Sequence, residues 1–118
     1  MIDGGNATIY VTDMDRAVKF FTETLGLKLD YQAGPEWAQV NAGKGLILGL
    51  HGVSHGATAG KDGSTIVGFE VDVPLEKVYD TLVQRGVKFD GPPVDTGHIK
   101  LAHFRDPDGN AFYLSETK

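Results

Sequence analysis

The sequence predicts an α+β fold built from two βαβββ modules in tandem. Strand-like and helix-like segments follow one another in the same order in each half of the 118 residues. Ile9 and Val11 correspond to Phe69 and Val71 at the same offset that separates the two glycines expected to end the helices. A fixed internal period of this kind indicates a duplication. The residue identities barely match, so chance similarity within a generic α+β domain is the alternative.

The first half begins with a strand over Asn6–Val11, where β-branched and aromatic residues alternate with smaller or polar ones. Asp13 is a good helix N-cap, and apolar residues recur at helical spacing up to Leu25, before Gly26 ends the helix. Glycine-rich turns then divide three further strands. These are Leu27–Gln32, Trp37–Asn41 and Leu46–His51.

The second half repeats this order after a glycine-rich loop over Gly52–Gly63. A strand at Thr65–Val73 precedes an apolar helical stripe from Leu75 to Val83, which Gly86 closes. Three strands follow, at Val87–Phe89, His98–Phe104 and Ala111–Ser115. We expect one domain over 1–118, with module 1 at about 5–52, a linker at about 53–63 and module 2 at about 64–118.

Composition excludes several classes of function. A hydrophobic fraction of 41% with 23% charged residues is typical of a globular chain, and a net charge of −5 without basic clusters argues against nucleic acid or an anionic membrane as a partner. The absence of cysteine excludes a thiolate nucleophile, a Cys-ligated zinc and an iron–sulfur cluster. No apolar run approaches the ~20 residues of a spanning helix, and the N-terminus lacks a signal-peptide pattern. We therefore expect a cytoplasmic protein whose partner is a small molecule.

Three features of the sequence, in this order, resemble the vicinal oxygen chelate superfamily. They are the βαβββ repeat, the stretch Val11–Phe21 leading into Leu25-Gly26-Leu27, and the closing Asp106-Pro107-Asp108-Gly109-Asn110. The superfamily includes glyoxalase I, extradiol dioxygenases and the fosfomycin- and bleomycin-resistance proteins, and the resemblance covers essentially the whole chain. It implies a curved, open, barrel-like mixed sheet with the helices outside, and a homodimer by analogy with small members. Taken alone, the closing segment has the chemistry of a tight hairpin turn.

The resemblance also indicates where a metal would be held. Metal-dependent members carry four ligands, usually His, Glu or Gln, on the first and fourth strands of the two modules. The corresponding positions here are Asn6, Gly49, Ile66 and Tyr113. None is a good divalent-metal ligand. His51 and His55 would converge on an ion only in a helix, which the surrounding glycines disfavour. We expect no cofactor, with a divalent metal at other residues as the disfavoured alternative.

Strand alternation from the same positions predicts which side chains face the cavity that the resemblance implies. Aromatic rings with a few polar groups are typical of a small-molecule site. The indole of Trp37, the sole tryptophan, could stack on a planar or cationic ligand, although core packing is its commoner role. The candidate ligand-binding residues are Tyr10, Trp37, Gln39, His51, Leu101, His103 and Tyr113.

Three functions are consistent with this set. The missing metal ligands and retained aromatic residues favour a metal-free small-molecule-binding protein of the glyoxalase/bleomycin-resistance type, holding a planar or amphipathic ligand. The alternative is a lyase- or isomerase-like enzyme of the same superfamily, with a different metal site or with Glu70 and His103 as an acid–base pair. A third is a protein–protein or regulatory module, in which Trp37 and Tyr113 would fill the cavity.

Overall fold

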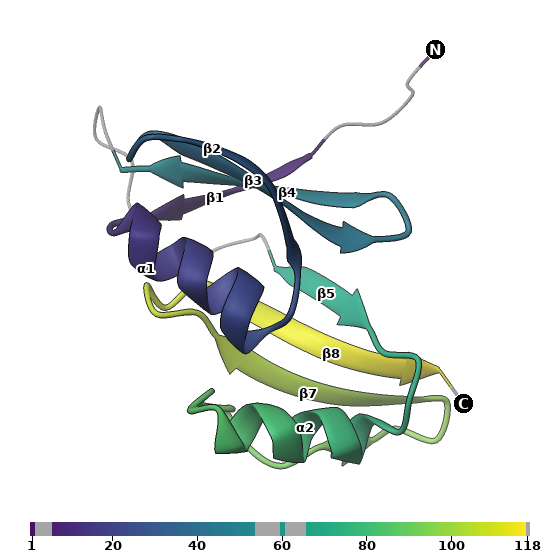
Figure 1. The fold of residues 1–118 in the computed structure, drawn as a ribbon. Helices are drawn as coiled ribbons and strands as arrows, with labels where there is room; N and C mark the ends of the chain where they lie inside the picture. Colours follow the sequence, from purple (N-terminus) through teal and green to yellow (C-terminus); the bar gives the residue numbers. More distant parts are fainter. Residues whose placement is uncertain (2–5, 54–59, 61–65, 118) are drawn as a thin grey trace. The chain divides into compact units, whose positions relative to one another are not determined.

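A computed structural model of the chain describes residues 1, 6–53, 60 and 66–117. The chain divides into two compact units, residues 1–61 and 62–118, and each contains a four-stranded mixed sheet with its own helix (Figure 1). The predicted α+β class and the repeated βαβββ order are confirmed. Most of the predicted linker, about 53–63, lies outside the described residues.

In the first unit the strand order is β1-β4-β3-β2, with β1 parallel to β4 and the other pairs antiparallel. We call this the first sheet. The helical segment begins as α1 and widens at its end into a π-helical turn, η1. The elements are β1 (Ala7–Val11), α1 (Met14–Lys19), η1 (Phe20–Thr24), β2 (Lys28–Ala33), β3 (Trp37–Gly43) and β4 (Leu46–Gly52).

The helix of the first unit begins where the sequence predicts it. The Asp13 carboxylate accepts a hydrogen bond from the backbone N–H of Arg16 at 3.1 Å, which satisfies one of the unpaired donors of the first turn. The prediction of one regular helix to Leu25 was incomplete, because the N–H of Leu25 donates to the carbonyl of Phe20, five residues back. Gly26, at φ 82°, then ends the helix.

In the second unit the strand order is β5-β8-β7-β6, with β5 parallel to β8. We call this the second sheet. The predicted strand at Thr65–Val73 is shorter in the structure, and Thr65 itself lies outside the described residues. The elements are β5 (Val67–Glu70), α2 (Leu75–Gln84), β6 (Val94–Asp95), β7 (Ile99–Arg105) and β8 (Ala111–Thr117).

The prediction of a strand at Val87–Phe89 was wrong. There, Phe89 makes only an isolated bridge with Phe104, and the edge strand is the later β6. The N–H of Val87 is used by the end of α2, where it donates to the Leu82 carbonyl. Pro92 and Pro93 have no N–H to donate to a ladder, so pairing resumes only after them.

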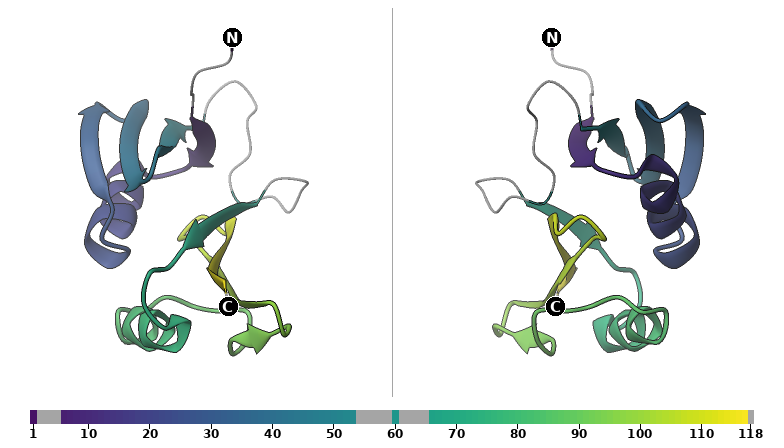
Figure 2. Two further views of the ribbon diagram at one scale, coloured as in Figure 1. Left: turned by 90° about the vertical axis from the view of Figure 1, so that its right-hand side faces the viewer. Right: turned by 90° about the vertical axis from the view of Figure 1, so that its left-hand side faces the viewer.

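One face of each sheet is buried against the helix of its own unit (Figures 1 and 2). In both sheets the buried hydrophobic residues alternate along the strands, while Gly49 and Ser115 on the opposite face are buried as well. Phe69, Phe104 and Phe112 form an aromatic stack in the second core, with centroids 5.5–6.4 Å apart. The buried hydrophobic strand residues are Ile9, Val11, Ala38, Val40, Leu48, Leu50, Ala102, Phe104, Phe112 and Leu114. The opposite face of each sheet therefore carries the residues predicted to bind ligand.

Candidate functional site

Four of the seven predicted ligand-binding residues share the open face of the first sheet. Tyr10 on β1 pairs with His51 on β4, and His51 pairs with Trp37 on β3. The ring centroids of Tyr10 and His51 are 5.4 Å apart, and those of Trp37 and His51 are 6.1 Å apart. We call these three rings the aromatic platform. Gln39 lies on the same face in the next row, opposite Gly49.

The indole of Trp37 is held in place from two sides. A Cβ atom built on Gly49 would lie 2.1 Å from Cη2 of Trp37, so the tip of the indole occupies the space that a side chain at position 49 would need. At the other end of the ring, Nε1–H of Trp37 donates a hydrogen bond of 3.1 Å to the hydroxyl of Tyr31 on β2. The indole therefore lies across the sheet in a fixed direction.

A β-bulge in β2 supplies this second contact. The register between β2 and β3 shifts between Leu29 and Tyr31, where Asp30 is the additional residue. Tyr31 bonds Trp37, while the carboxylate of Asp30 accepts a hydrogen bond of 3.2 Å from the side-chain amide of Gln39. Neither residue could be predicted from the sequence, because a bulge leaves no distinctive pattern in a short strand.

The orientation of His51 is fixed by its own backbone. Its Nδ1 atom lies 2.6 Å from the carbonyl oxygen of Gly52. A carbonyl oxygen only accepts hydrogen bonds, so Nδ1 carries the proton and donates it. In the neutral ring Nε2 is then an acceptor.

The other three predicted residues share the open face of the second sheet. His103 on β7 pairs with Tyr113 on β8, with ring centroids 5.7 Å apart, and Leu101 lies on the same strand and face as His103. Tyr113 pairs in turn with Gly68 on β5, where an added Cβ would lie 2.2 Å from the tyrosine ring. Each unit thus lays an aromatic side chain over a glycine, but at positions that are not equivalent, because Trp37 on β3 covers Gly49 on β4 whereas Tyr113 on β8 covers Gly68 on β5.

The candidate acid–base pair is not in contact. Glu70 is on β5 and His103 is on β7, and β8 lies between them in the sheet. Glu70 pairs with Ser115, whereas His103 pairs with Tyr113, so the two side chains also belong to different rows. Strands two positions apart are separated by about 10 Å, which is too far for direct proton transfer.

The four positions that correspond to family metal ligands do not fit a divalent metal. Gly49 has no side-chain donor and the Trp37 indole fills the space above it, while Ile66 is apolar. The Asn6 amide oxygen already accepts a hydrogen bond from the Thr8 hydroxyl at 2.9 Å. Among the described residues no group of three or more His, Asp or Glu is placed to hold an ion. His51 lies in β4, and His55 lies outside the described residues.

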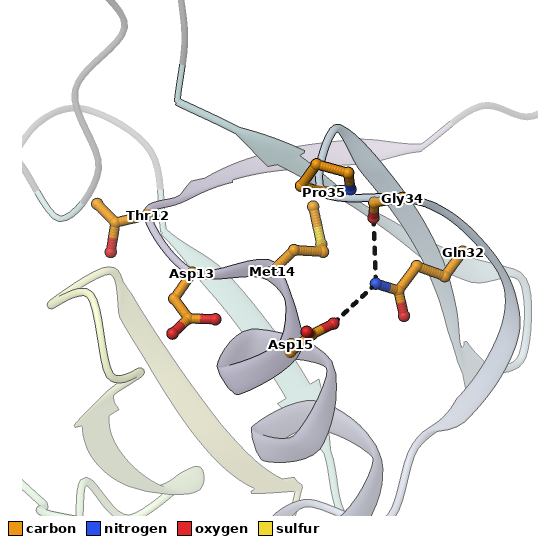
Figure 3. A pocket seen from close by; sticks show the side chains of 7 residues that line it. All are labelled: Thr12, Asp13, Met14, Asp15, Gln32, Gly34 and Pro35. Carbon is orange, nitrogen blue, oxygen red and sulfur yellow. Dashed lines mark hydrogen bonds between the residues drawn. The ribbon is translucent and has the colours of Figure 1, made fainter.

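A pocket that the sequence did not predict lies beside the start of α1 (Figure 3). Its volume is ≈ 460 Å³. The side chains around it bond one another, since the Gln32 amide donates to Asp15 at 3.2 Å and to the Gly34 carbonyl at 3.1 Å. Its lining residues are Thr12, Asp13, Met14, Asp15, Gln32, Gly34 and Pro35. Asp13 caps the helix by accepting a hydrogen bond from Arg16, so this carboxylate is already used by the fold. We therefore place the candidate ligand site on the platform and not in this pocket.

The closing Asp106-Pro107-Asp108-Gly109-Asn110 segment forms the predicted turn between β7 and β8. The Asp106 side chain is 6% exposed and accepts hydrogen bonds from the N–H groups of Asp108 and Asn110 and from the Asn110 amide, at 2.7–3.0 Å. Burial raises the pKa of the Asp106 carboxyl above its usual value, against the lowering effect of these bonds. The turn is a folding element and not part of either open face.

Comparison with known proteins agrees with the fold and these motifs. The family model described as Glyoxalase/Bleomycin resistance protein/Dioxygenase superfamily matches residues 5–114. The chain belongs to this superfamily, which confirms the resemblance found in the sequence.

Individual relatives cover nearly the whole chain. The uncharacterized protein YetH of Bacillus subtilis (strain 168) is 32% identical over 120 residues, covering 95% of this chain and 96% of its own. The structure of TnmS3, an antibiotic binding protein from Streptomyces sp. CB03234, is similar with a TM-score of 0.83 at 28% identity, covering 100% and 98% of the two chains. A superfamily member from Sphaerobacter thermophilus DSM 20745 has a TM-score of 0.81 at 28% identity, covering 98% of each.

Among the described residues, no helix is both long and apolar enough to cross a membrane.

Proposed function

We propose that this protein binds a small planar or amphipathic molecule on the aromatic platform, without a metal and without chemical conversion. The observation that carries the proposal is the position of Trp37, which Gly49 and Tyr31 hold in one orientation beside His51. A fixed aromatic ring loses little entropy when a flat ligand stacks on it. A relative with 28% identity over the full chain, TnmS3, is an antibiotic binding protein, which supports the same class of function.

The donor set supports binding without a metal. A divalent ion needs imidazole or carboxylate ligands, and three of the four corresponding positions hold Gly49, Ile66 and a phenol, Tyr113. Elemental analysis of protein purified without chelator, then challenged with nickel, zinc, manganese and iron, tests this directly. We expect no metal above background, and one tightly bound ion per chain would contradict the proposal.

Binding itself can be followed at Trp37, because it is the sole tryptophan and gives the only indole N–H signal in a ¹H–¹⁵N spectrum. Titration with 2-methoxynaphthalene, a flat probe, should shift this signal saturably, whereas 1-adamantanol, which is bulky but not flat, should not. In Trp37→Leu the neighbouring Gly49 and His51 amide signals should no longer respond to the flat probe. If neither probe moves the platform signals in the natural protein, the proposal fails.

We also propose that the protein is a homodimer, as is common for small proteins of this superfamily. Size-exclusion chromatography with light scattering should give about twice the monomer mass of 12.7 kDa. A mass equal to that of the monomer would overturn this part of the proposal. Ligand binding on the platform would then involve a single chain.

A further inference from the structure

We infer that the ligand of the aromatic platform binds through hydrogen-bond donors, N–H or O–H groups at the edge of a flat ring system, which are accepted by His51 and Gln39. This inference rests on the proposed function and adds to it the chemical class of the ligand. It depends on which atoms of these two side chains the protein already uses and which it leaves toward the open face.

His51 offers an acceptor. Because Nδ1 donates to the Gly52 carbonyl at 2.6 Å, the neutral ring has its lone pair on Nε2. Among the described residues no side chain or backbone group donates to that Nε2 atom. The ring is half-buried between Tyr10 and Trp37, so a ligand that stacks on the platform would reach it.

Gln39 offers a second acceptor for a similar reason. A carboxylate can only accept a hydrogen bond, so the contact with Asp30 at 3.2 Å must involve the NH₂ group of the Gln39 amide. This fixes the amide orientation and leaves Oε1 on the other side, where no donor among the described residues bonds it. Asp30 is therefore a positioning residue that determines which end of the amide a ligand meets.

The two acceptors are close enough to serve one molecule. Gln39 pairs with Gly49, and His51 follows Gly49 by two residues on the same strand and face. Such diagonal neighbours have Cβ atoms roughly 7–8 Å apart, close to the length of a fused two-ring system. Gly49 places no side chain between the two acceptors, and the tip of the Trp37 indole lies over this glycine.

An anionic ligand should bind poorly at His51 and Gln39, because both side chains present lone pairs toward it. A carboxylate or phosphate on the ligand would face acceptors without protons to share, and Asp30 adds a negative charge nearby. Lys28 is a cation on this face, where it pairs with Asn41 one row beyond Gln39. Preference for an anion would therefore indicate binding at Lys28 and not at the His51 and Gln39 pair.

Three flat probes of equal size separate these possibilities. They are 2-naphthol, which carries a donor, 2-methoxynaphthalene, which does not, and 2-naphthoate, which is an anion. Dissociation constants come from the shift of the Trp37 indole signal at a pH where the His51 ring is shown by NMR to be neutral. We expect 2-naphthol to bind roughly 3- to 10-fold more tightly than 2-methoxynaphthalene, the effect of one additional hydrogen bond, and 2-naphthoate to bind most weakly.

Two variants assign the effect. His51→Phe keeps an aromatic ring but removes the acceptor, and Gln39→Met keeps the length of the side chain but removes the amide. The single O–H of 2-naphthol can donate to only one acceptor at a time, so each single variant should reduce the preference for 2-naphthol over 2-methoxynaphthalene in part. The double variant should abolish it while flat probes still bind. His98→Phe, the same change at an exposed histidine before β7, is the matched control and should keep the full preference.

The outcomes distinguish this inference from the proposed function. If all three probes shift the Trp37 signal but 2-naphthol has no advantage, or if 2-naphthoate binds most tightly, the platform binds flat molecules and the inference is wrong. If no probe shifts the signal, the proposed function fails first. Should a variant not fold, the ¹⁵N signal of His51 Nε2 in the natural protein still tests whether this atom accepts a hydrogen bond from the ligand. We expect 2-naphthol to shift this signal and 2-methoxynaphthalene to leave it in place.

Discussion

The tip of the Trp37 indole lies where a side chain at position 49 would have to begin. An ideal Cβ on Gly49 would be 2.1 Å from Cη2 and 2.8 Å from Cζ2 of the indole, distances that real atoms do not adopt. Gly49 is not at a positive φ, so the backbone conformation does not require glycine at this position. Glycine is required because a side chain would overlap the indole. The position of the only tryptophan thus depends on a glycine on the neighbouring strand.

Replacing Gly49 with alanine should therefore displace Trp37. The methyl group collides with a ring that Tyr31 holds from the other end, and overpacking of this kind costs about 1–3 kcal/mol of the free energy of unfolding. Urea unfolding gives the stability, and the wavelength of tryptophan emission reports the displacement.

A double-mutant cycle tests the cause of that loss. In a Trp37→Leu background the collision partner is absent, so Gly49→Ala should cost much less than in the natural protein. An equal cost in both backgrounds would show that the strand at position 49, and not the indole, opposes the substitution.

Tyr31→Phe removes the acceptor of the Trp37 indole N–H while keeping the ring. Tyr31 is 51% exposed and the bond is not buried, so we expect a loss of stability below about 1 kcal/mol. The larger effect should fall on binding, because an unfixed indole must be ordered by the ligand, and the affinity for 2-methoxynaphthalene should fall several-fold. The position of the indole N–H signal should change as well. The same substitution at Tyr79, which packs on Phe89 in the other unit, should change neither the affinity for 2-methoxynaphthalene nor the indole N–H signal.

The scaffold could be predicted because it depends on signals that are local in the sequence. Alternation places Ala38 and Val40 in the core and Trp37 and Gln39 on the open face, as the burial of these residues shows. Asp13 and Gly26 mark the ends of the first helical segment by cap chemistry that operates within a few residues. The ligand-binding role of the platform residues stays a prediction.

The features that sequence reasoning missed depend on contacts between distant segments. The bulge that turns Asp30 and Tyr31 toward Gln39 and Trp37 is a property of the pairing between two strands and not of either strand alone. The edge strand at Val94–Asp95 is set by where Pro92 and Pro93 interrupt the ladder, and a two-residue strand has no period to detect.

Asp106 should give the protein a recognisable pH dependence. Its pKa is raised by burial in the native state, so between the ordinary value and this higher value the native protein holds a proton that the unfolded chain has released. The free energy of unfolding should therefore fall as the pH rises through that interval. Because Asp106→Asn cannot titrate, the stability of the natural protein relative to this variant should decline over the same interval.

Urea unfolding of both proteins at a series of pH values measures this difference, and the other carboxyls cancel in the comparison. A natural protein that gained stability relative to Asp106→Asn with rising pH would contradict the raised pKa. Asp106→Ala removes all three accepted hydrogen bonds of the turn and should cost about 1–3 kcal/mol. Because alanine cannot titrate either, this cost should also decline over the same pH interval.

The start of α2 is stabilised by a residue from the far end of the chain. Pro74 precedes the helix and has no side chain that can cap it, and the N–H of Leu75 instead donates to the Glu116 carboxylate on β8 at 2.7 Å. Glu116→Ala should cost about 0.5–2 kcal/mol, the usual effect of losing a helix cap, and Glu116→Gln should cost less because its amide oxygen can still accept. Urea unfolding monitored by circular dichroism measures both, with Glu36→Ala in the turn before β3 as the exposed control. If Glu116→Ala and Glu36→Ala were equally mild, the bond between Glu116 and the start of α2 would contribute nothing to stability, and α2 would depend on its other contacts, such as the burial of Leu75 and Leu82.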